Sequence, residues 1–230
     1  MSNKKNILIV GAGAVGLVYG FHLHQAGHRI SFLVKPSHVE ALRNGMTLHQ
    51  LGFFSTKTQH WADFHLIADP LDASRQPWDQ IWLTVPSTAL RTESIEHVLA
   101  ASGDATVIGL QPDASDADWL AAQLPSPENR VQGMIGFISY QSPLPGTPGL
   151  EGMCYFLPPV SASLFEGVNQ NRRDAVIRDL KAGRMATQAI GSIDESAHGA
   201  DGMLIPLVAA LELHGWRLQG FAQSPEGKLG

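Results

Sequence analysis

The sequence has few of the features that mark disulfide-stabilised, membrane-spanning or nucleic-acid-binding proteins. Its single cysteine, Cys154, excludes an intramolecular disulfide and is typical of a reducing compartment. No apolar run is long enough to cross a membrane. The 16 Lys and Arg are outnumbered by 21 Asp and Glu, and the net charge of −5 disfavours a nucleic-acid surface. We therefore expect a cytoplasmic protein that binds neither membrane nor nucleic acid.

Motifs for metal binding and nucleophilic catalysis are also missing. The ten histidines include no HExxH or other familiar ligand spacing, and His22 and His24 are two residues apart on a predicted helix, so their side chains diverge. There is no nucleophile elbow and no Walker sequence. A catalytic role for Cys154 needs a base beside it, and the favoured alternative is a buried packing role. We expect no metal site.

What the sequence does contain is a strand, a glycine-rich turn and a helix in immediate succession. Residues 7–10 (ILIV) are apolar and rich in β-branched side chains, which predicts a buried strand. The motif GAGAVG follows at residues 11–16. Residues 15–25 then show a helical pattern, and Gly27 stands where a helix-terminating glycine is usual. This order is typical of a dinucleotide-binding fold.

Each glycine of the motif has a physical role in such a site. Gly11 permits the tight turn, Gly13 lets the backbone approach a pyrophosphate, and Gly16 lets the helix pack closely on the strand. The first N–H groups of the helix, including those of Ala14 and Val15, lack intrahelical partners and attract negative charge. We therefore predict these residues as cofactor ligands. The alternative is a glycine turn in another α/β fold.

The end of the second predicted strand, residues 29–34, indicates which dinucleotide is bound. An NAD site usually has Asp or Glu there to hold the ribose 2′-hydroxyl. This chain instead has Lys35, followed by Pro36, Ser37 and His38. Because a lysine with a neighbouring hydroxyl suits a 2′-phosphate, we predict NADP(H) as the cofactor and Lys35 as its ligand. A solvated lysine at a strand end is the alternative.

Further along, short strands alternate with helices, which predicts an α/β doubly wound Rossmann domain with helices on both faces of a parallel sheet. The expected strands are at 63–68, 80–85, 106–110, 130–140 and 155–157, with a hairpin at 46–58 around Gly52. The expected helices are at 36–44, 87–101, 116–124, 173–182 and 202–214.

The pattern becomes helical near residue 170, which places a domain boundary there. We predict a dinucleotide-binding domain over 1–168 and a short, incomplete helical segment over 169–230. About 60 residues is small for an independent domain. The segment therefore indicates a truncated member of a longer family or a chain that borrows a partner, such as a second copy in a homodimer.

The N-terminal residues ILIVGAGAVGLVYGFHLHQAGHRISFLVK, together with EALRNG, resemble the ketopantoate reductase family. The resemblance is good over about the first 55 residues and continues more weakly through QIWLTV, TVIGLQ and RVQGMIGFISY. It implies an NADP-binding Rossmann domain, a helical second domain, and NADPH-dependent reduction of a 2-keto acid between them. It also implies that Val85, Pro86 and Gln111 lie beside the cofactor.

The chain departs from this family at the reacting end of the site. The strand resembling IWLTV is usually followed by a lysine, and Pro86 stands there. The strand resembling TVIGLQ usually continues into Asn-Gly, whereas here Gln111 is followed by Pro112 and Asp113. The family's catalytic lysine belongs to a helix that best matches residues 202–211, which contain no lysine. Lys181, in the preceding helix, is the nearest candidate.

Hydride reduction of a ketone generates an alkoxide, which needs a donor to stabilise and protonate it. Besides Lys181, the candidates are Gln111, Ser139, Tyr140, Glu195 and His198. Three functions remain open. The first is an NADP-dependent oxidoreductase acting on a small keto acid or related carbonyl. The second is a non-catalytic dinucleotide-binding protein, such as a redox sensor or an assembly subunit. The third is a dimeric enzyme whose site is completed by a second chain.

Overall fold

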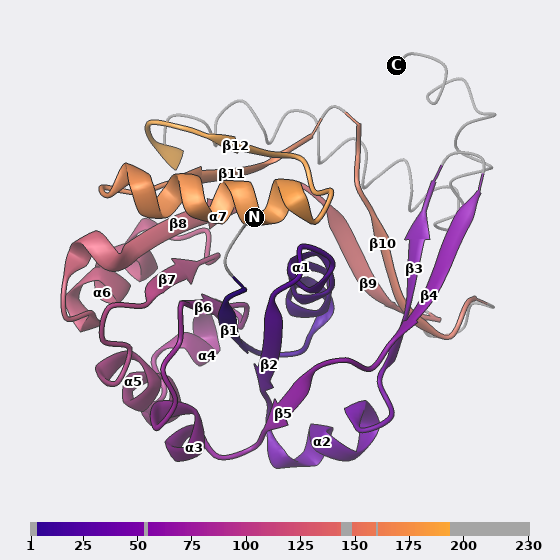
Figure 1. The fold of residues 1–230 in the computed structure, drawn as a ribbon, viewed down its shortest axis with the longest axis horizontal. Coiled ribbons are helices and arrows are strands. Elements are labelled where there is room, and N and C mark those ends of the chain that lie inside the picture. The colour runs from indigo at the N-terminus through magenta and orange to yellow at the C-terminus, as the bar shows by residue number, and fades with distance from the viewer. Residues whose placement is uncertain (1–3, 53–54, 144–148, 160, 194–230) are drawn as a thin grey trace.

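Two β-sheets with helix α1 between them form the framework of the protein (Figure 1). A computed structural model describes residues 4–52, 55–143, 149–159 and 161–193. No helix in these segments has the length and apolar character needed to cross a membrane. The helices are α1 (Ala14–Gln25), α2 (Pro36–Leu42), α3 (Pro70–Ser74), α4 (Ser87–Leu90), α5 (Glu93–Ala100), α6 (Ala114–Gln123), the 3-10 turn Pro127–Asn129 and α7 (Gln170–Ala182).

The larger sheet confirms the doubly wound prediction. Its spatial order is β12-β11-β8-β7-β6-β1-β2-β5, and the strands from β8 to β5 all pair in parallel. β11 is antiparallel to β8 and parallel to β12. The strands are β1 (Asn6–Val10), β2 (Arg29–Leu33), β5 (His65–Ile67), β6 (Gln80–Leu83), β7 (Thr106–Gly109), β8 (Arg130–Met134), β11 (Ser163–Glu166) and β12 (Thr187–Ala189). The chain order reverses between β1 and β6, where such folds bind ligands.

Alternation along the strands divides the core between the two faces of this sheet. Ile7 and Ile9 of β1 belong to the core that includes α1 and α7, whereas Leu8 and Val10 belong to the core that includes α3 to α6. All four side chains are at most 5% exposed. Both faces are therefore covered, which is why β1 reads as a continuous apolar run instead of alternating apolar and polar residues.

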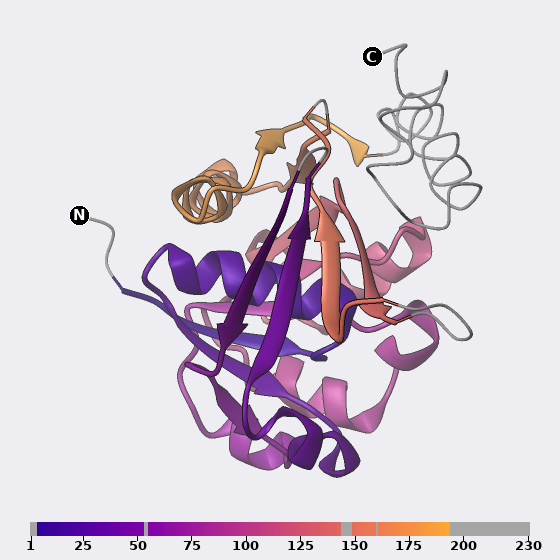
Figure 2. The same ribbon diagram turned by 90° about the vertical axis from the view of Figure 1, so that its right-hand side faces the viewer.

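A smaller sheet packs on the other side of α1, and Figure 2 faces it. Its order is β4-β3-β10-β9, formed by β3 (Met46–Leu51), β4 (Thr56–Trp61), β9 (Ile138–Ser142) and β10 (Gly152–Phe156). The antiparallel β3–β4 pair confirms the predicted hairpin. Because β10 pairs with β3 across about 100 residues of sequence, local pattern alone does not reveal this sheet.

The prediction of one strand over 130–140 was wrong. The chain forms β8 in the larger sheet and β9 in the smaller one, with a break around Gly136. A Cβ at Gly136 would lie 2.3 Å from the carbonyl carbon of Ala162, and the Gly136 N–H donates to Ser163 Oγ at 3.1 Å. Close contact with this distant segment turns the chain from one sheet to the other.

Two further expectations need correction. The helix expected over 87–101 is two helices, α4 and α5, with Arg91 and Thr92 between them in non-helical conformations. The strand expected at 155–157 lies in β10 and is not the last, since β11 and β12 follow it. Within the predicted segment 169–230, α7 packs on α1 and β12 pairs with β11 in the larger sheet. The helix expected over 202–214 lies outside the described residues.

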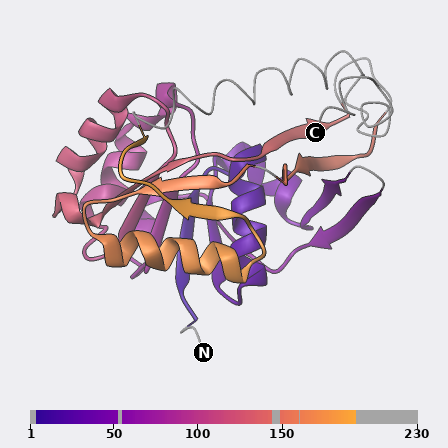
Figure 3. The same ribbon diagram turned by 90° about the horizontal axis from the view of Figure 1, so that it is seen from above.

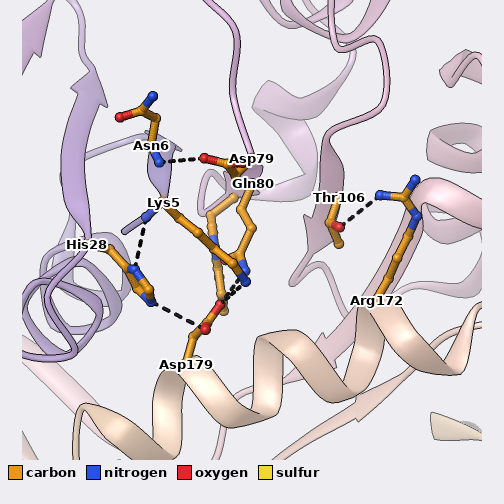
Figure 4. Close-up of polar contacts among 9 residues, drawn as sticks. Lys5, Asn6, His28, Asp79, Gln80, Thr106, Arg172 and Asp179 are labelled. Carbon is orange, nitrogen blue, oxygen red and sulfur yellow. Dashed lines mark hydrogen bonds and ion pairs between the residues drawn. The ribbon is translucent and has the colours of Figure 1, made fainter. Parts of the chain in front are cut away.

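One buried carboxylate ties α7 to the amino-terminal ends of the parallel strands (Figure 4). Asp179 Oδ2 accepts hydrogen bonds from Lys5 Nζ at 2.6 Å and from Gln80 Nε2 at 2.7 Å. Asp179 Oδ1 lies 3.3 Å from His28 Nε2. The Lys5 backbone N–H donates to His28 Nδ1, so Nε2 carries the ring proton that faces Asp179. Lys5, His28 and Gln80 mark the starts of β1, β2 and β6.

The other end of α7 is held at the same edge of the sheet. Arg172 donates to the Asp104 carbonyl oxygen at 2.8 Å and to Thr106 Oγ1 at 3.2 Å, at the start of β7. Viewed from above, α7 lies on the side from which the N-terminal segment emerges (Figure 3). Helix α7 therefore covers the edge of the sheet opposite to the carboxyl ends of its strands.

Candidate functional site

The predicted glycine turn lies at the carboxyl end of β1, at the point where the strand order reverses. Strands β2 and β6 flank β1, with Val10 paired to both Leu33 and Leu83. The Gly11 N–H donates to the Leu33 carbonyl oxygen at 2.9 Å. The turn is thus fixed to the ends of two neighbouring strands in the crevice where doubly wound folds bind dinucleotides.

Backbone geometry explains two of the three glycines. Gly11 has φ +101°, a conformation that favours glycine, and a Cβ there would lie 3.2 Å from Val85 Cγ1. A Cβ at Gly16 would lie 2.1 Å from the Gly11 carbonyl oxygen and 2.6 Å from Thr84 Oγ1. Only glycine at position 16 lets α1 approach the turn this closely.

Gly13 differs, because its surroundings within the protein are open. A Cβ at this position would meet no heavy atom within 4 Å, although Gly13 directly precedes α1 and its carbonyl accepts from the Leu17 N–H at 2.9 Å. The first N–H groups of α1 have no intrahelical acceptors and carry the positive end of the helix dipole. The space above Gly13 therefore suits an anionic group held close to bare backbone.

Thr84, which sequence reasoning missed, fastens the turn to the end of β6. Its Oγ1 lies 2.9 Å from the Val10 carbonyl oxygen and 2.8 Å from that of Gly11, so its one hydroxyl hydrogen is shared between them. The Thr84 backbone N–H donates to the Val10 carbonyl oxygen at 3.1 Å. A hydroxyl at the end of QIWLT, beside the glycine motif in the predicted sheet, was the only signal in the sequence. Thr84 holds the turn in shape and leaves the N-terminus of α1 open.

Lys35 lies at the same edge of the sheet as the glycine turn. It stands two residues beyond Leu33, whose carbonyl binds Gly11, and it directly precedes α2. Its side chain is exposed, and Ser37 and His38 occupy the exposed first turn of α2. Lys35 and Ser37 therefore both lie beyond the carboxyl end of β2, where such folds bind the substituent on the ribose 2′ position.

The loops after β6 and β7 are joined through Gln111, which is 4% exposed. Its side-chain Nε2 donates to the carbonyl oxygens of Leu83 at 3.1 Å and Val85 at 2.8 Å, and its Oε1 accepts from the Leu110 N–H. Both amide hydrogens are thus bonded to backbone. Gln111 positions the loop that carries Val85 and Pro86 against the glycine turn, and Pro86 leads into α4.

The structure separates Lys181, the nearest lysine candidate, from this crevice. Lys181 is exposed on the last turn of α7, which packs at the amino ends of the strands, roughly 15 Å away along a five-residue strand. Ser139 and Tyr140 belong to β9 in the smaller sheet. Glu195 and His198 lie outside the described residues.

Cys154, at 2% exposure, pairs with Tyr140 across β9 and β10, as its predicted packing role requires. Burial raises the pKa of the Cys154 thiol, against the effect of hydrogen bonds with Ser142 and Tyr140. Burial and the neighbouring thiol raise the pKa of Tyr140 to about 12. Neither group has the lowered pKa of an activated nucleophile.

Solved structures share this fold at low sequence identity. D-mandelate dehydrogenase with NADH and anilino(oxo)acetate superposes with a TM-score of 0.62 at 19% identity over 80% of this chain. A 2-dehydropantoate 2-reductase from Geobacter metallireducens GS-15 gives 0.61 at 18% over 80%, and a PanE/ApbA family ketopantoate reductase from Ralstonia eutropha JMP134 gives 0.61 at 21% over 82%. The matches cover 56%, 57% and 57% of those chains. This chain therefore spans little more than half the length of these proteins.

No curated protein matches the chain in sequence. The family profile described as ketopantoate reductase PanE/ApbA matches residues 7–147, which is more than half of the sequence. The match begins in β1, contains the whole glycine turn, and includes Lys35, Thr84 and Gln111. By this match and by its fold, the chain belongs to the ketopantoate reductase PanE/ApbA family.

Proposed function

We propose that the protein is an NADP(H)-dependent oxidoreductase that reduces the carbonyl of a small keto acid. The observation that carries this proposal is the contrast within the glycine turn at the β1–β6 switch point. Gly16 is closed by the protein's own backbone, whereas the space over Gly13 is free. Close packing at Gly16 together with free space at Gly13 supports a ligand-binding role for the turn over a purely structural one.

In this proposal the N-terminus of α1 holds the pyrophosphate of the cofactor, with Gly13, Ala14 and Val15 supplying backbone N–H groups. Lys35 pairs with the ribose 2′-phosphate, and Val85 and Pro86 line the opposite side of the crevice. The bound NADPH supplies the hydride. Family membership and the dehydrogenase fold of the neighbours support this assignment.

Substitution of Lys35 by alanine is expected to weaken NADPH binding far more than NADH binding. The variant loses one charge-assisted contact to the 2′-phosphate, worth about 1.5–3 kcal/mol, which corresponds to roughly a 10- to 150-fold rise in Kd. NADH has no phosphate at that position. Parallel fluorescence titrations with both cofactors measure the difference. Lys4→Ala, an exposed lysine before β1, serves as the control, and equal losses of NADPH and NADH affinity in Lys35→Ala would contradict the assignment.

The non-catalytic alternative is favoured by three specific observations. Among the described residues, Pro86 stands where relatives place a lysine, the Gln111 amide is fully engaged, and Lys181 lies at the opposite edge of the sheet. If the protein is an enzyme, we propose that its donor comes from residues 194–230, where Glu195 is the predicted candidate, or from a second copy of the chain.

Turnover separates the two functions. NADPH oxidation is measured with a panel of 2-keto acids after NADPH binding has been established by fluorescence. The enzyme proposal expects absorbance loss at the nicotinamide band with at least one keto acid, and none without substrate. Tight NADPH binding without turnover of any keto acid would instead support the redox-sensor or assembly-subunit role.

A further inference from the structure

A second pocket lies between α1 and the smaller sheet, far from the glycine turn. It encloses about 220 Å³ and is walled by α1, β3, β4, β10 and the turn after α7. This volume equals that of about seven water molecules. His22 in its floor is nine residues beyond Gly13, about 13 Å along the axis of α1. We call this the α1–β10 pocket, and it has no lining residue in common with the dinucleotide crevice.

The floor of the α1–β10 pocket is apolar and aromatic, whereas its rim is polar. Phe21, Leu48 and Tyr155 form the apolar floor and are at most 6% exposed. The rim carries Lys57 and Arg184 together with glutamine amides, and none of the lining residues that the structure describes is acidic. In a chain of net charge −5, this local excess of positive charge favours an anionic ligand.

His22 adds a buried hydrogen-bond acceptor to the floor. Its side-chain Nδ1 lies 2.6 Å from the Gly183 carbonyl oxygen, and because a carbonyl only accepts, Nδ1 carries the ring proton. Burial lowers the pKa of His22, although the Gly183 hydrogen bond opposes this shift, so the ring is neutral. Nε2 is then an acceptor, and among the residues that the structure describes it has no hydrogen-bond partner, although His22 is only 3% exposed. Buried acceptors of this kind are rarely left unpaired.

Arg184 occupies a backbone position that usually belongs to glycine. Helix α7 ends in a Schellman motif, in which the Met185 N–H donates to the Leu180 carbonyl and the Arg184 N–H to that of Lys181, both at 3.0 Å. The left-handed residue of this motif is Arg184, with φ 67°. An L side chain adopts this conformation at a cost that glycine avoids.

The turn does contain a glycine, Gly183, but it lies one position before the left-handed residue, where close packing excludes a side chain. A Cβ on Gly183 would lie 1.9 Å from the His22 carbonyl oxygen of α1. This contact explains Gly183 but not the arginine that follows it. Residues held in sparsely populated backbone conformations, such as a non-glycine residue in the left-handed region, cluster at functional sites. Arg184 lines the α1–β10 pocket, so its guanidinium is available to bind a ligand there.

We propose that the α1–β10 pocket binds a small carboxylic acid with an apolar or aromatic body. Arg184 and Lys57 hold the carboxylate, and the body lies on Phe21, Leu48 and Tyr155. A hydroxyl on the ligand donates to His22 Nε2. The site is separate from the dinucleotide crevice, and the proposal does not depend on the oxidoreductase function.

The test is a calorimetric titration with 3-phenyllactate, which combines a carboxylate, a hydroxyl and an aromatic ring. Saturable binding is expected for the unmodified protein. Arg184→Gly removes the guanidinium and also relieves the left-handed backbone, so it should retain or raise the melting temperature while affinity falls at least about tenfold. Arg178→Ala, which removes an exposed arginine of α7 outside the lining of the pocket, is the matched control and should bind normally.

Probes that lack one feature test each contact separately. 3-Phenylpropanoate lacks the hydroxyl for His22 and should bind more weakly, as should the uncharged amide of phenyllactate. Absence of saturable binding at millimolar concentrations, or equal affinity in Arg184→Gly, overturns the proposal. Inorganic phosphate that binds as tightly as phenyllactate overturns the assignment to a carboxylic acid. Binding that is lost in Gly13→Val but kept in Arg184→Gly places the acid in the dinucleotide crevice and also refutes the pocket.

Discussion

Substitution of Gly13 by valine is expected to abolish NADPH and NADH binding while leaving the protein folded. The backbone at Gly13 has φ −81° and ψ −170°, which valine adopts without strain. No heavy atom of the described part of the chain lies within 4 Å of the added Cβ, so the branched side chain extends into the space assigned to the pyrophosphate. We expect Kd for both cofactors to rise at least about 100-fold, which is about 2.7 kcal/mol of binding free energy.

The fold should tolerate this change because the substitution removes no capping side chain from the N-terminus of α1. Valine is a poorer residue than glycine at that position, and we expect the melting temperature to fall by about 4 °C or less. The same test at Gly16 would not separate binding from folding, since a Cβ there lies 2.1 Å from the Gly11 carbonyl oxygen. Fluorescence titration and thermal denaturation of the Gly13 variant measure the two quantities independently.

Gly191 offers the matched control for Gly13. A Cβ at Gly191 also meets no heavy atom within 4 Å, but this residue follows β12 at the far edge of the larger sheet. Gly191→Val should therefore bind both cofactors as the unmodified protein does. Undiminished NADPH binding by Gly13→Val would show that no dinucleotide lies over the glycine turn.

Substitution of Asp179 by asparagine should strongly lower the free energy of unfolding. The carboxylate is 4% exposed and serves Lys5, His28 and Gln80 at once, so its removal leaves the Lys5 ammonium without its anion at the edge of the core. Breaking a buried ion pair in this way costs about 3–5 kcal/mol. For a chain of this size the melting temperature should fall by roughly 6–20 °C.

The effect of Asp179 should depend on pH in a defined direction. Burial alone raises the pKa of Asp179, but the ring N–H of His28 and the ammonium of Lys5 outweigh burial and hold the pKa below its usual value of 3.8. Stabilisation by a group with a depressed pKa is fully present above the unfolded-state value and is lost as the pH falls through the folded-state value. The stability difference between the two proteins should therefore shrink below about pH 4.

Asp174 provides the control on the same helix. Its side chain is 48% exposed, and within the described ranges its ion pair is with its neighbour Arg173, so Asp174→Asn should change stability by less than about 0.5 kcal/mol. Denaturant unfolding at neutral and acid pH measures both variants. Equal stability of Asp179→Asn and the unmodified protein would show that the network around α7 adds nothing to the fold.

The glycine turn of the candidate cofactor site was predictable from sequence because its determinants are local. A strand, a glycine turn and a helix lie within residues 6–25, and each glycine's role follows from its position in that order. Lys35 was proposed as a cofactor ligand by the same kind of argument, and this role stays a prediction. Thr84 was not, since its bonds to Val10 and Gly11 cross more than 70 residues of sequence.

The reacting half of the site could not be judged without the fold. Gln111 was a candidate donor by its place after a strand, but its amide hydrogens bind backbone carbonyls 26 and 28 residues away. Lys181 was the nearest lysine in sequence to the family's catalytic position. Only the buried contacts of Asp179, on the same helix, place it at the opposite edge of the sheet.

The sequence by itself determined the local elements, the glycine turn and the alternation that gives a parallel, doubly wound sheet. These features follow from side-chain period and turn chemistry within about 20 residues. The tertiary structure alone decided the split of 130–140 between two sheets, the pairing of β10 with β3 and the course of α7 across the strand ends. Each depends on contacts between segments far apart in the chain, whose partners no local pattern specifies.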